Sequence, residues 1–280
     1  MATIIITDST CDIPKGVIEE LGIKIAPLKV IFSGIEYVDG VDITTTEFYE
    51  KLKTADELPS TSQVNPDEFM NLFKPILDNG DDILCMFISG KLSGTYQSAV
   101  LAKAELGAEN IFIIEGNGAT VQMGALIMAV AKLNLKNPPV EELFTTASEM
   151  NKKATLYGIV DTLEYLKKGG RLSATKAVLG TMLKVKPILT VDDGVINVLA
   201  SPKGRKKAIR ELKNLMDNKG HSFDGKDLLI GHSDDEEKEA LFIKFVNDNY
   251  NPASITRSHI GAVIGTHTGP GCVCVGFIAD

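Results

Sequence analysis

A chain of 280 residues, 44% of them hydrophobic, can bury one large core or two modest ones, and its length favours two domains. The formal net charge of −8 argues against a nucleic-acid-binding protein, because phosphate contacts need a concentrated positive surface. The best apolar run, residues 124–131, is too short to span a bilayer, and the first residues lack the basic segment of a signal peptide. We therefore expect a cytoplasmic protein.

The first half of the chain alternates between strand and helix patterns. Apolar or β-branched runs are followed by segments with helix-start and helix-stop residues, among them Thr44 and Glu47, which have the spacing of a capping box. The expected strands are residues 3–7, 23–32, 83–88 and 111–114, and the expected helices are residues 14–22, 44–53, 66–79, 95–106, 120–136 and 140–153. This alternation predicts an α/β fold with a parallel sheet covered by helices on both faces.

The second half has shorter strands and a different texture. We expect strands at residues 155–159, 187–191, 195–199, 228–230, 255–260 and 273–278, with helices at 205–218 and 236–249. The sequence Asp192-Asp193-Gly194 indicates a hairpin turn and so some antiparallel pairing. We therefore predict an N-terminal α/β domain over residues 1–154 and a C-terminal α+β domain over residues 155–280. The segment near residues 58–80 is a candidate to pack against the second domain.

The turn at residues 89–94 joins an expected strand to an expected helix and is the first candidate site. The first amides of a helix lack partners within the helix, so Ser93, Gly94 and Thr95 could hold a carboxylate or a phosphate. The alternative is that Ser93 or Thr95 only caps its own helix. The sequence matches neither a nucleophile elbow nor a Walker loop, because Lys91 stands where the elbow needs glycine and Leu92 follows Lys91.

Residues 8–10 and 115–118 also follow expected strands. In a parallel α/β sheet, ligands bind beyond the carboxyl ends of the strands, so these turns and residues 89–94 are expected on one rim. Two further segments are rich in hydroxyls or glycine: residues 59–63, expected as a loop, and residues 261–271, which contain His267. The first could instead solvate itself through local hydrogen bonds, and the second could be a glycine-rich turn between strands.

Charged and metal-binding patterns are weaker. The basic segments 167–171 and 203–207 could form a docking or phosphate patch or a solvated surface. The acidic segment 233–236 has the spacing of a capping box and is interpreted as a helix start. The four cysteines are expected as free thiols, and the Cys272-x-Cys274 pair has no partner pair at zinc-ligand spacing. We expect neither a metal nor a bound cofactor.

Five ordered segments together resemble the DegV family of bacterial fatty-acid-binding proteins, and the resemblance runs from end to end. These segments are residues 7–14 (TDSTCDIP), 59–63 (PSTSQ), 88–99 (ISGKLSGTYQSA), 162–171 (TLEYLKKGGR) and 265–271 (GTHTGPG). The resemblance implies a two-domain α/β protein that buries one long-chain fatty acid and has no catalytic activity alone. It implies a carrier subunit that presents the carboxylate to a separate fatty acid kinase, which makes acyl-phosphate for phospholipid synthesis with its own ATP and magnesium. Transient contact with a membrane surface is expected of such a carrier.

The resemblance also implies roles for particular residues. Thr61, Ser62 and Ser93 would hydrogen-bond the carboxylate, with the Gly94 amide and His267 nearby. A second group, Arg171, Lys203 and Arg205, would contact the kinase or its phosphate.

The chain departs from the family pattern after residue 114. It has Glu115, Gly116, Thr120 and Gln122 where the family usually shows Asp-Ser and a later Ser and Gly, which implies a reshaped pocket or a different chain selectivity.

Two alternatives from other classes are kept. The chain could be an enzyme acting alone on a small carboxylate or phosphorylated substrate through Ser93 and His267, although no third residue at recognisable spacing orients His267. A pure interaction protein would leave the convergent hydroxyls and glycines unexplained. Co-purified fatty acid, detected by mass spectrometry of the denatured protein, would favour the carrier.

Overall fold

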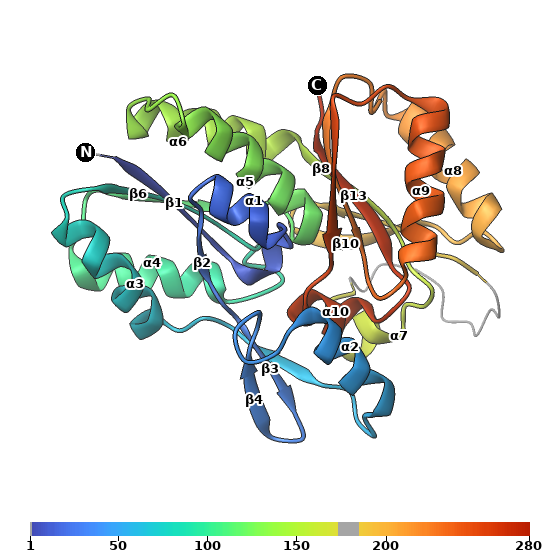
Figure 1. Cartoon of the computed structure of the whole chain (residues 1–280), viewed down its shortest axis with the longest axis horizontal. Coiled ribbons are helices and arrows are strands. Elements are labelled where there is room, and N and C mark those ends of the chain that lie inside the picture. Colours follow the sequence, from blue (N-terminus) through green and yellow to red (C-terminus); the bar gives the residue numbers. More distant parts are fainter. Residues whose placement is uncertain (1, 173–184) are drawn as a thin grey trace.

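Two β-sheets with helices on their faces form the body of the molecule (Figure 1). The computed structural model describes residues 2–172 and 185–280. The first sheet is parallel, with strand order β2-β1-β6-β7. Its strands are β1 Thr3–Asp8, β2 Lys24–Ala26, β6 Asp82–Phe87 and β7 Ile111–Glu115. Strands β1 and β6 bury nearly every side chain, as a parallel sheet covered on both faces requires. The parallel first half is thus confirmed.

The second sheet has six strands in the order β10-β9-β8-β13-β11-β12. Its neighbours pair antiparallel except β11 and β12, which are parallel. The strands are β8 Ala154–Ile159, β9 Ile188–Asp192, β10 Val195–Ala200, β11 Asp227–His232, β12 Ser254–His259 and β13 Val273–Ile278. The turn between β9 and β10 has positive φ at Asp193 (50°) and Gly194 (72°), which is the backbone that a tight hairpin needs. The predicted hairpin and mixed sheet are confirmed.

A small third sheet was not predicted. Its antiparallel strands lie in the order β4-β3-β5, and they are β3 Lys29–Phe32, β4 Ile35–Val38 and β5 Ser60–Ser62. The single extended run expected over residues 23–32 is wrong, because the chain leaves the first sheet at Pro27, which has no amide hydrogen to donate to a strand partner. The loop expected over residues 59–63 is also wrong, because residues 60–62 pair with β3.

The helices and sheets form five layers. Helices α3 Pro66–Asp78 and α4 Thr95–Leu106 cover one face of the first sheet, and α8 Arg205–Asn218 and α9 Glu236–Asn249 cover the outer face of the second. The central layer holds α1 Lys15–Glu20, α5 Thr120–Asn134 and α6 Val140–Lys153. The remaining helices are η1 Ser9–Cys11, α2 Thr45–Thr54, α7 Glu164–Lys168 and α10 Ala262–Thr268. In Figure 1, α2, α7 and α10 gather below the sheets.

Helix α5 contacts both sheets and is therefore apolar on almost all sides. Its approach to β13 depends on Gly276, since a Cβ there would lie 1.9 Å from the carbonyl oxygen of Val121. Helix starts follow local signals: Thr44 and Glu47 form the predicted capping box of α2. At α9 the cap is Asp235, and not Ser233 as the spacing predicted. Within residues 2–172 and 185–280, we find no helix with the length and hydropathy to cross a bilayer.

Candidate ligand-binding cavity

A deep cavity lies where α5 begins, between the inner face of the second sheet and α10. It encloses about 1010 Å³ of empty space, its open mouth included. Its apolar wall comes mainly from the second sheet and the central layer, including Leu156, Leu189, Val191, Ile196 and Ile264. Gly158 pairs with Leu189 on one side and Cys274 on the other, so these three residues form a cross-strand row along the wall. The inside of the cavity is therefore mostly hydrocarbon.

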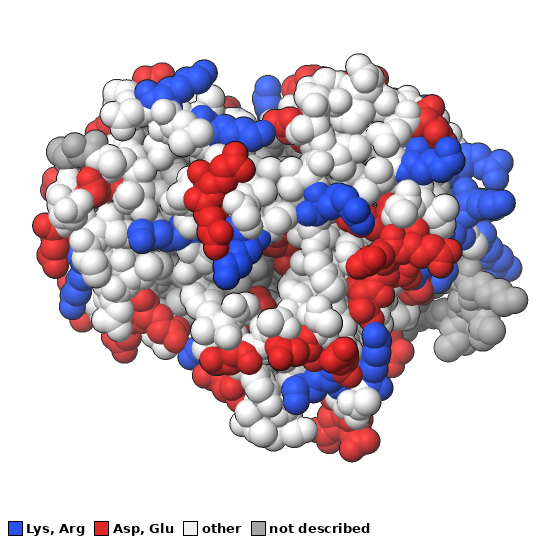
Figure 2. Space-filling view, viewed as in Figure 1, with Lys and Arg blue, Asp and Glu red and all other residues white. Residues whose placement is uncertain are grey.

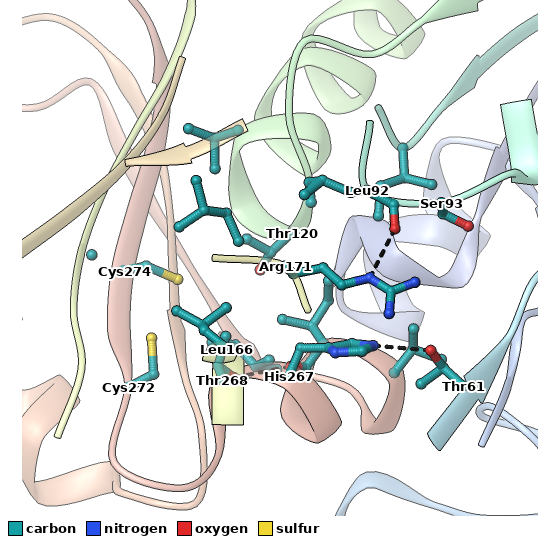
Figure 3. Close-up of a pocket in the computed structure, with 18 of the residues that line it drawn as sticks. Thr61, Leu92, Ser93, Thr120, Leu166, Arg171, His267, Thr268, Cys272 and Cys274 are labelled. Carbon is teal, nitrogen blue, oxygen red and sulfur yellow. Dashed lines mark hydrogen bonds between the residues drawn. The ribbon is translucent and has the colours of Figure 1, made fainter. Parts of the chain in front are cut away.

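The five residues predicted near a carboxylate come together from three separate segments. Thr61 and Ser62 lie on β5, Ser93 and Gly94 on the turn before α4, and His267 near the end of α10. The Thr61 hydroxyl and His267 Nε2 are 2.9 Å apart (Figure 3). Figure 3 shows Ser93, Thr61 and His267 toward one side, and Cys272 and Cys274 on the opposite side. All five residues predicted near a carboxylate thus line this one cavity.

His267 is held as a neutral ring in a tight slot. Burial lowers the pKa of His267 to about 4, and the positive charge of Arg171 adds to this effect. At neutral pH the ring therefore has one N–H donor and one acceptor nitrogen. Its buried Nδ1 has no hydrogen-bond partner among the described residues. Gly169 lies directly against it, since a Cβ at this position would come within 2.3 Å of Nδ1.

The contacts of Ser93 agree in part with both interpretations of its turn, as a helix cap and as a ligand-binding site. Its hydroxyl lies 3.0 Å from the hydroxyl of Thr95 and accepts the Thr95 amide at 3.3 Å, so it is partly engaged in its own helix start. The same residue also lines the cavity. The N-cap of α4 is Gly94, which lacks a side chain, and a Cβ there would meet the Gln63 side chain at 2.1 Å. Gln63, which the sequence interpretation did not assign, donates to Ser98 and so joins the β5 segment to α4.

Arg171 lies in the cavity wall. Its Nε donates to the Leu92 carbonyl at 3.1 Å (Figure 3), and its Nη1 donates to the Gly169 carbonyl at 2.7 Å. Among the described lining residues, it is the one with a permanent charge. The guanidinium therefore ties the end of α7 to the turn that carries Ser93.

The other two residues predicted to contact a kinase lie elsewhere. Arg205 begins α8 and lines a separate small hollow with Lys186 and Lys238, which both donate to Asp161 at 2.7 and 2.8 Å. Lys203 pairs through its backbone with Val185. Figure 2 shows Lys and Arg side chains gathered at the edge of the molecule where α8 lies. Arg171 and Arg205 thus do not share one pocket.

The residues that depart from the family pattern also lie in different places, some in the cavity lining and some outside it. Thr120 lines the cavity, whereas Glu115 accepts the Gly90 amide at 3.0 Å and Gln122 donates to the Ala154 carbonyl at 2.8 Å. Thr120 was noted as part of this departure and not as a site residue. Thr268, another lining residue, was not assigned at all.

The described contacts do not form a catalytic triad. His267 Nε2 is bonded to Thr61 and not to Ser93, and no carboxylate or carbonyl among the described residues orients Nδ1. The four cysteines are free and buried, and the described residues contain no group of three or more potential metal ligands. The alternative interpretation of residues 261–271, a glycine-rich turn between strands, is wrong in part, because residues 262–268 form α10.

Fold and site together define a class: an α/β protein with two main sheets and a cavity that is polar at one end and apolar over the rest of its lining. The chain belongs to the DegV family, since the family model, described as an uncharacterised protein of the DegV family, matches residues 2–280. A DegV domain-containing protein of Caldanaerobacter subterraneus is 36% identical over 273 residues, which cover 98% of this chain and 97% of that protein.

Solved structures are similar to this chain over its whole length. A DegV family protein of Thermus thermophilus, described as binding fatty acid, superposes with a TM-score of 0.91 at 30% identity and covers 100% of both chains. A stearic-acid-binding protein of Eubacterium ventriosum has a TM-score of 0.89 at 28% identity, and the match covers 100% of this chain and 98% of the other. The α/β fold class is confirmed.

Proposed function

We propose that this protein binds one long-chain fatty acid in the cavity and presents its carboxylate to a separate fatty acid kinase for phosphorylation to acyl-phosphate. The observation that carries the proposal is the distribution of polarity in the cavity. Hydroxyls, an imidazole and a helix start gather at one end, and aliphatic side chains form most of the remaining lining. The fatty-acid binding described for the proteins of T. thermophilus and E. ventriosum supports it.

The tail supplies most of the affinity. Each buried methylene contributes about 0.8 kcal/mol, so a sixteen-carbon chain contributes on the order of 10 kcal/mol before ordering costs.

The head group needs several donors because a buried carboxylate without partners is costly. The hydroxyls of Ser62 and Ser93 and the Gly94 amide are suitable donors. When His267 Nε2 carries the proton of the neutral ring and donates it to the Thr61 oxygen, the Thr61 hydroxyl becomes a further donor. Arg171 donates two of its N–H groups to backbone carbonyls. A carboxylate held mainly by neutral donors keeps an oxygen that is nucleophilic enough to attack the terminal phosphorus of ATP held by the kinase.

The ligand is tested first. The purified protein is denatured and extracted, and the extract is analysed by mass spectrometry, with the expected result of about one fatty acid per chain. The delipidated protein is then titrated with palmitate. An empty extract together with no binding of palmitate would rule out the proposal.

The head-group contacts are tested with Ser93→Ala, which should weaken palmitate binding by about tenfold, the value of one hydrogen bond to a charged group. The matched control is Ser148→Ala, since Ser148 donates only to the Phe144 carbonyl within α6. Equal affinities of the two variants for palmitate would contradict the assigned role of Ser93.

The kinase contact is tested by replacing Lys203 and Arg205 together with alanine. Because both lie outside the cavity lining, palmitate binding should stay unchanged while the kinase requires more carrier for the same rate of acyl-phosphate formation. The control replaces the exposed Lys74 and Lys136 with alanine. If both double variants support the same rate at every carrier concentration, this contact does not exist.

A further inference from the structure

The helix that carries His267 is held at its start by two buried carboxyl groups from the first third of the chain. The Gly261 amide donates to Asp12 Oδ1 at 2.8 Å, and the Ala262 amide donates to Asp39 Oδ1 at 3.3 Å. Asp12 follows η1 and Asp39 follows β4, and their exposed fractions are 6% and 7%. The amides at this helix start thus find acceptors more than 200 residues away in the sequence.

Asp12 has two further contacts that reach the cavity wall and the second sheet. Its Oδ2 accepts the hydroxyl of Thr120 at 2.6 Å, and Thr120 lines the cavity at the start of α5. The Ser258 hydroxyl donates to the Asp12 carbonyl, which joins this residue to the end of β12. Asp12 and Thr120 both have left-handed backbone angles, with φ of 49° and 50°. Aspartate tolerates this conformation, whereas a β-branched residue such as Thr120 adopts it only where its surroundings hold it there.

These carboxyls are costly to keep where they are. Burial raises the pKa of Asp12 to about 8 and the pKa of Asp39 to about 6. Ionisation of both groups is therefore less favourable than that of an exposed aspartate, and a pair of apolar or amide side chains would avoid this cost. The positions of the two carboxyl groups are explained by their hydrogen bonds to the start of α10. Helix α10 has seven residues and so a length of about 10 Å, which is short enough for a displacement at its start to move the imidazole near its end.

We propose that Asp12 and Asp39 are positioning residues of the head-group site, which hold α10 so that His267 meets Thr61 at the polar end of the cavity. The inference rests on the proposed fatty-acid binding. Neither carboxyl lines the cavity, so both act through α10, and Asp12 also acts through Thr120.

The test compares two ligands with the same tail, palmitate and hexadecanol, on the full-length delipidated protein. Asp12→Gly removes the carboxyl without a penalty for the left-handed backbone, and Asp39→Ala removes the second one. Each should lower the ratio of palmitate affinity to hexadecanol affinity by about fivefold, the size of one weakened hydrogen bond. Asp12→Asn keeps an acceptor for the Gly261 amide and should restore most of the ratio. The exposed Asp78→Ala serves as control.

A role limited to stability would lower both affinities together and leave the ratio unchanged, and that result would overturn the inference. Ser258→Ala is a milder variant that loosens Asp12 through its carbonyl, and it should lower the ratio in the same direction even if the deletion variants do not fold. If the wild-type protein binds neither ligand, the proposed function itself fails. An unchanged ratio in variants that still bind palmitate counts against the positioning role alone.

Discussion

The contact between Gly169 and His267 shows how one small residue shapes the head-group site. The backbone of Gly169 is ordinary, with φ of −74°, so glycine is not needed there for conformation. It is needed for space, because a Cβ would come within 2.3 Å of His267 Nδ1 and 3.0 Å of the Tyr165 carbonyl oxygen. The ring cannot keep its place beside a larger residue, and its bond to Thr61 depends on that place.

We predict that Gly169→Ala weakens palmitate binding by roughly tenfold, because overpacking on this scale costs about 1–3 kcal/mol. The binding of hexadecanol should fall less, because the tail wall is untouched. Titration calorimetry of the two ligands measures the difference. The control is Gly16→Ala in α1, where a Cβ meets no atom within 4 Å. Wild-type affinity for palmitate in Gly169→Ala would show that the ring position does not matter.

At the scale of elements, the hairpin of β9 and β10 docks on the turn that carries Ser93. The Ser89 hydroxyl donates to the Gly194 carbonyl at 3.0 Å, and Lys91 Nζ donates to the Asp193 carbonyl at 2.8 Å. Gly194 has φ of +72°, and a Cβ there would lie 2.4 Å from the Ser89 hydroxyl. The backbone and the close approach, more than the ion pair, hold the two turns together, because Asp193 is 90% exposed.

Gly194→Ala should therefore lower the free energy of unfolding by about 1–2 kcal/mol, from left-handed strain and the contact with Ser89. Lys91→Ala should lower it by about 0.5 kcal/mol or less, as is usual for exposed ion pairs. Urea unfolding of the two variants, followed by circular dichroism, provides the comparison. An equal or larger loss for Lys91→Ala would mean that charge holds this junction.

The elements that local sequence patterns predict correctly are those stabilised by contacts between residues that are close in the sequence. The structure contains the capping box of Thr44 and Glu47 and the hairpin turn at Asp193 at the positions that the sequence predicts. Strand β5 was missed because its residues, Ser-Thr-Ser, favour a loop, and it exists through pairing with β3. Helix α10 was missed because it is short and contains glycine. Gly265 is needed there since a Cβ would come within 2.6 Å of the Tyr49 hydroxyl, a contact no local pattern contains.

The candidate site was predictable only in part for the same reason. The rule for parallel sheets pointed to the turn with Ser93, but Thr61 and His267 are 206 residues apart in sequence, and only the family resemblance indicated that they meet. In the sequence, Asp12 lies just before the helix expected over residues 14–22 and is interpreted as part of its start. Its bond to the Gly261 amide joins the two ends of the chain and could not be seen in the sequence.

At the scale of the whole molecule, three buried carboxyl groups make the free energy of unfolding depend on pH. They belong to Asp8 at the end of β1, Asp12 after η1 and Asp39 after β4. Burial raises the pKa of Asp8 and Asp39 to about 6 and that of Asp12 to about 8. In the unfolded chain an aspartate has a pKa of about 3.9, so the folded protein binds more protons above that pH. The stability linked to these groups is fully present below about pH 3.9 and is lost as pH rises through 6 and then 8. His267 acts in the opposite direction: its lowered pKa, about 4, contributes stability that is present above its unfolded value, about 6.5, and lost toward pH 4.

Between about pH 7.5 and 8.5, the contributions of Asp8, Asp39 and His267 have nearly levelled off, and that of Asp12 still falls. We predict that the free energy of unfolding decreases over this interval by up to about 1.4 kcal/mol per pH unit, the value for one proton. Asp12→Asn, whose amide resembles the protonated carboxyl and tolerates the left-handed backbone, should remove most of this slope. Urea unfolding at half-unit intervals of pH measures it, with the exposed Asp67→Asn as control. If Asp12→Asn keeps the wild-type slope, then Asp12 is ionised in the folded protein at neutral pH, and its bonds to Gly261 and Thr120 are those of a carboxylate.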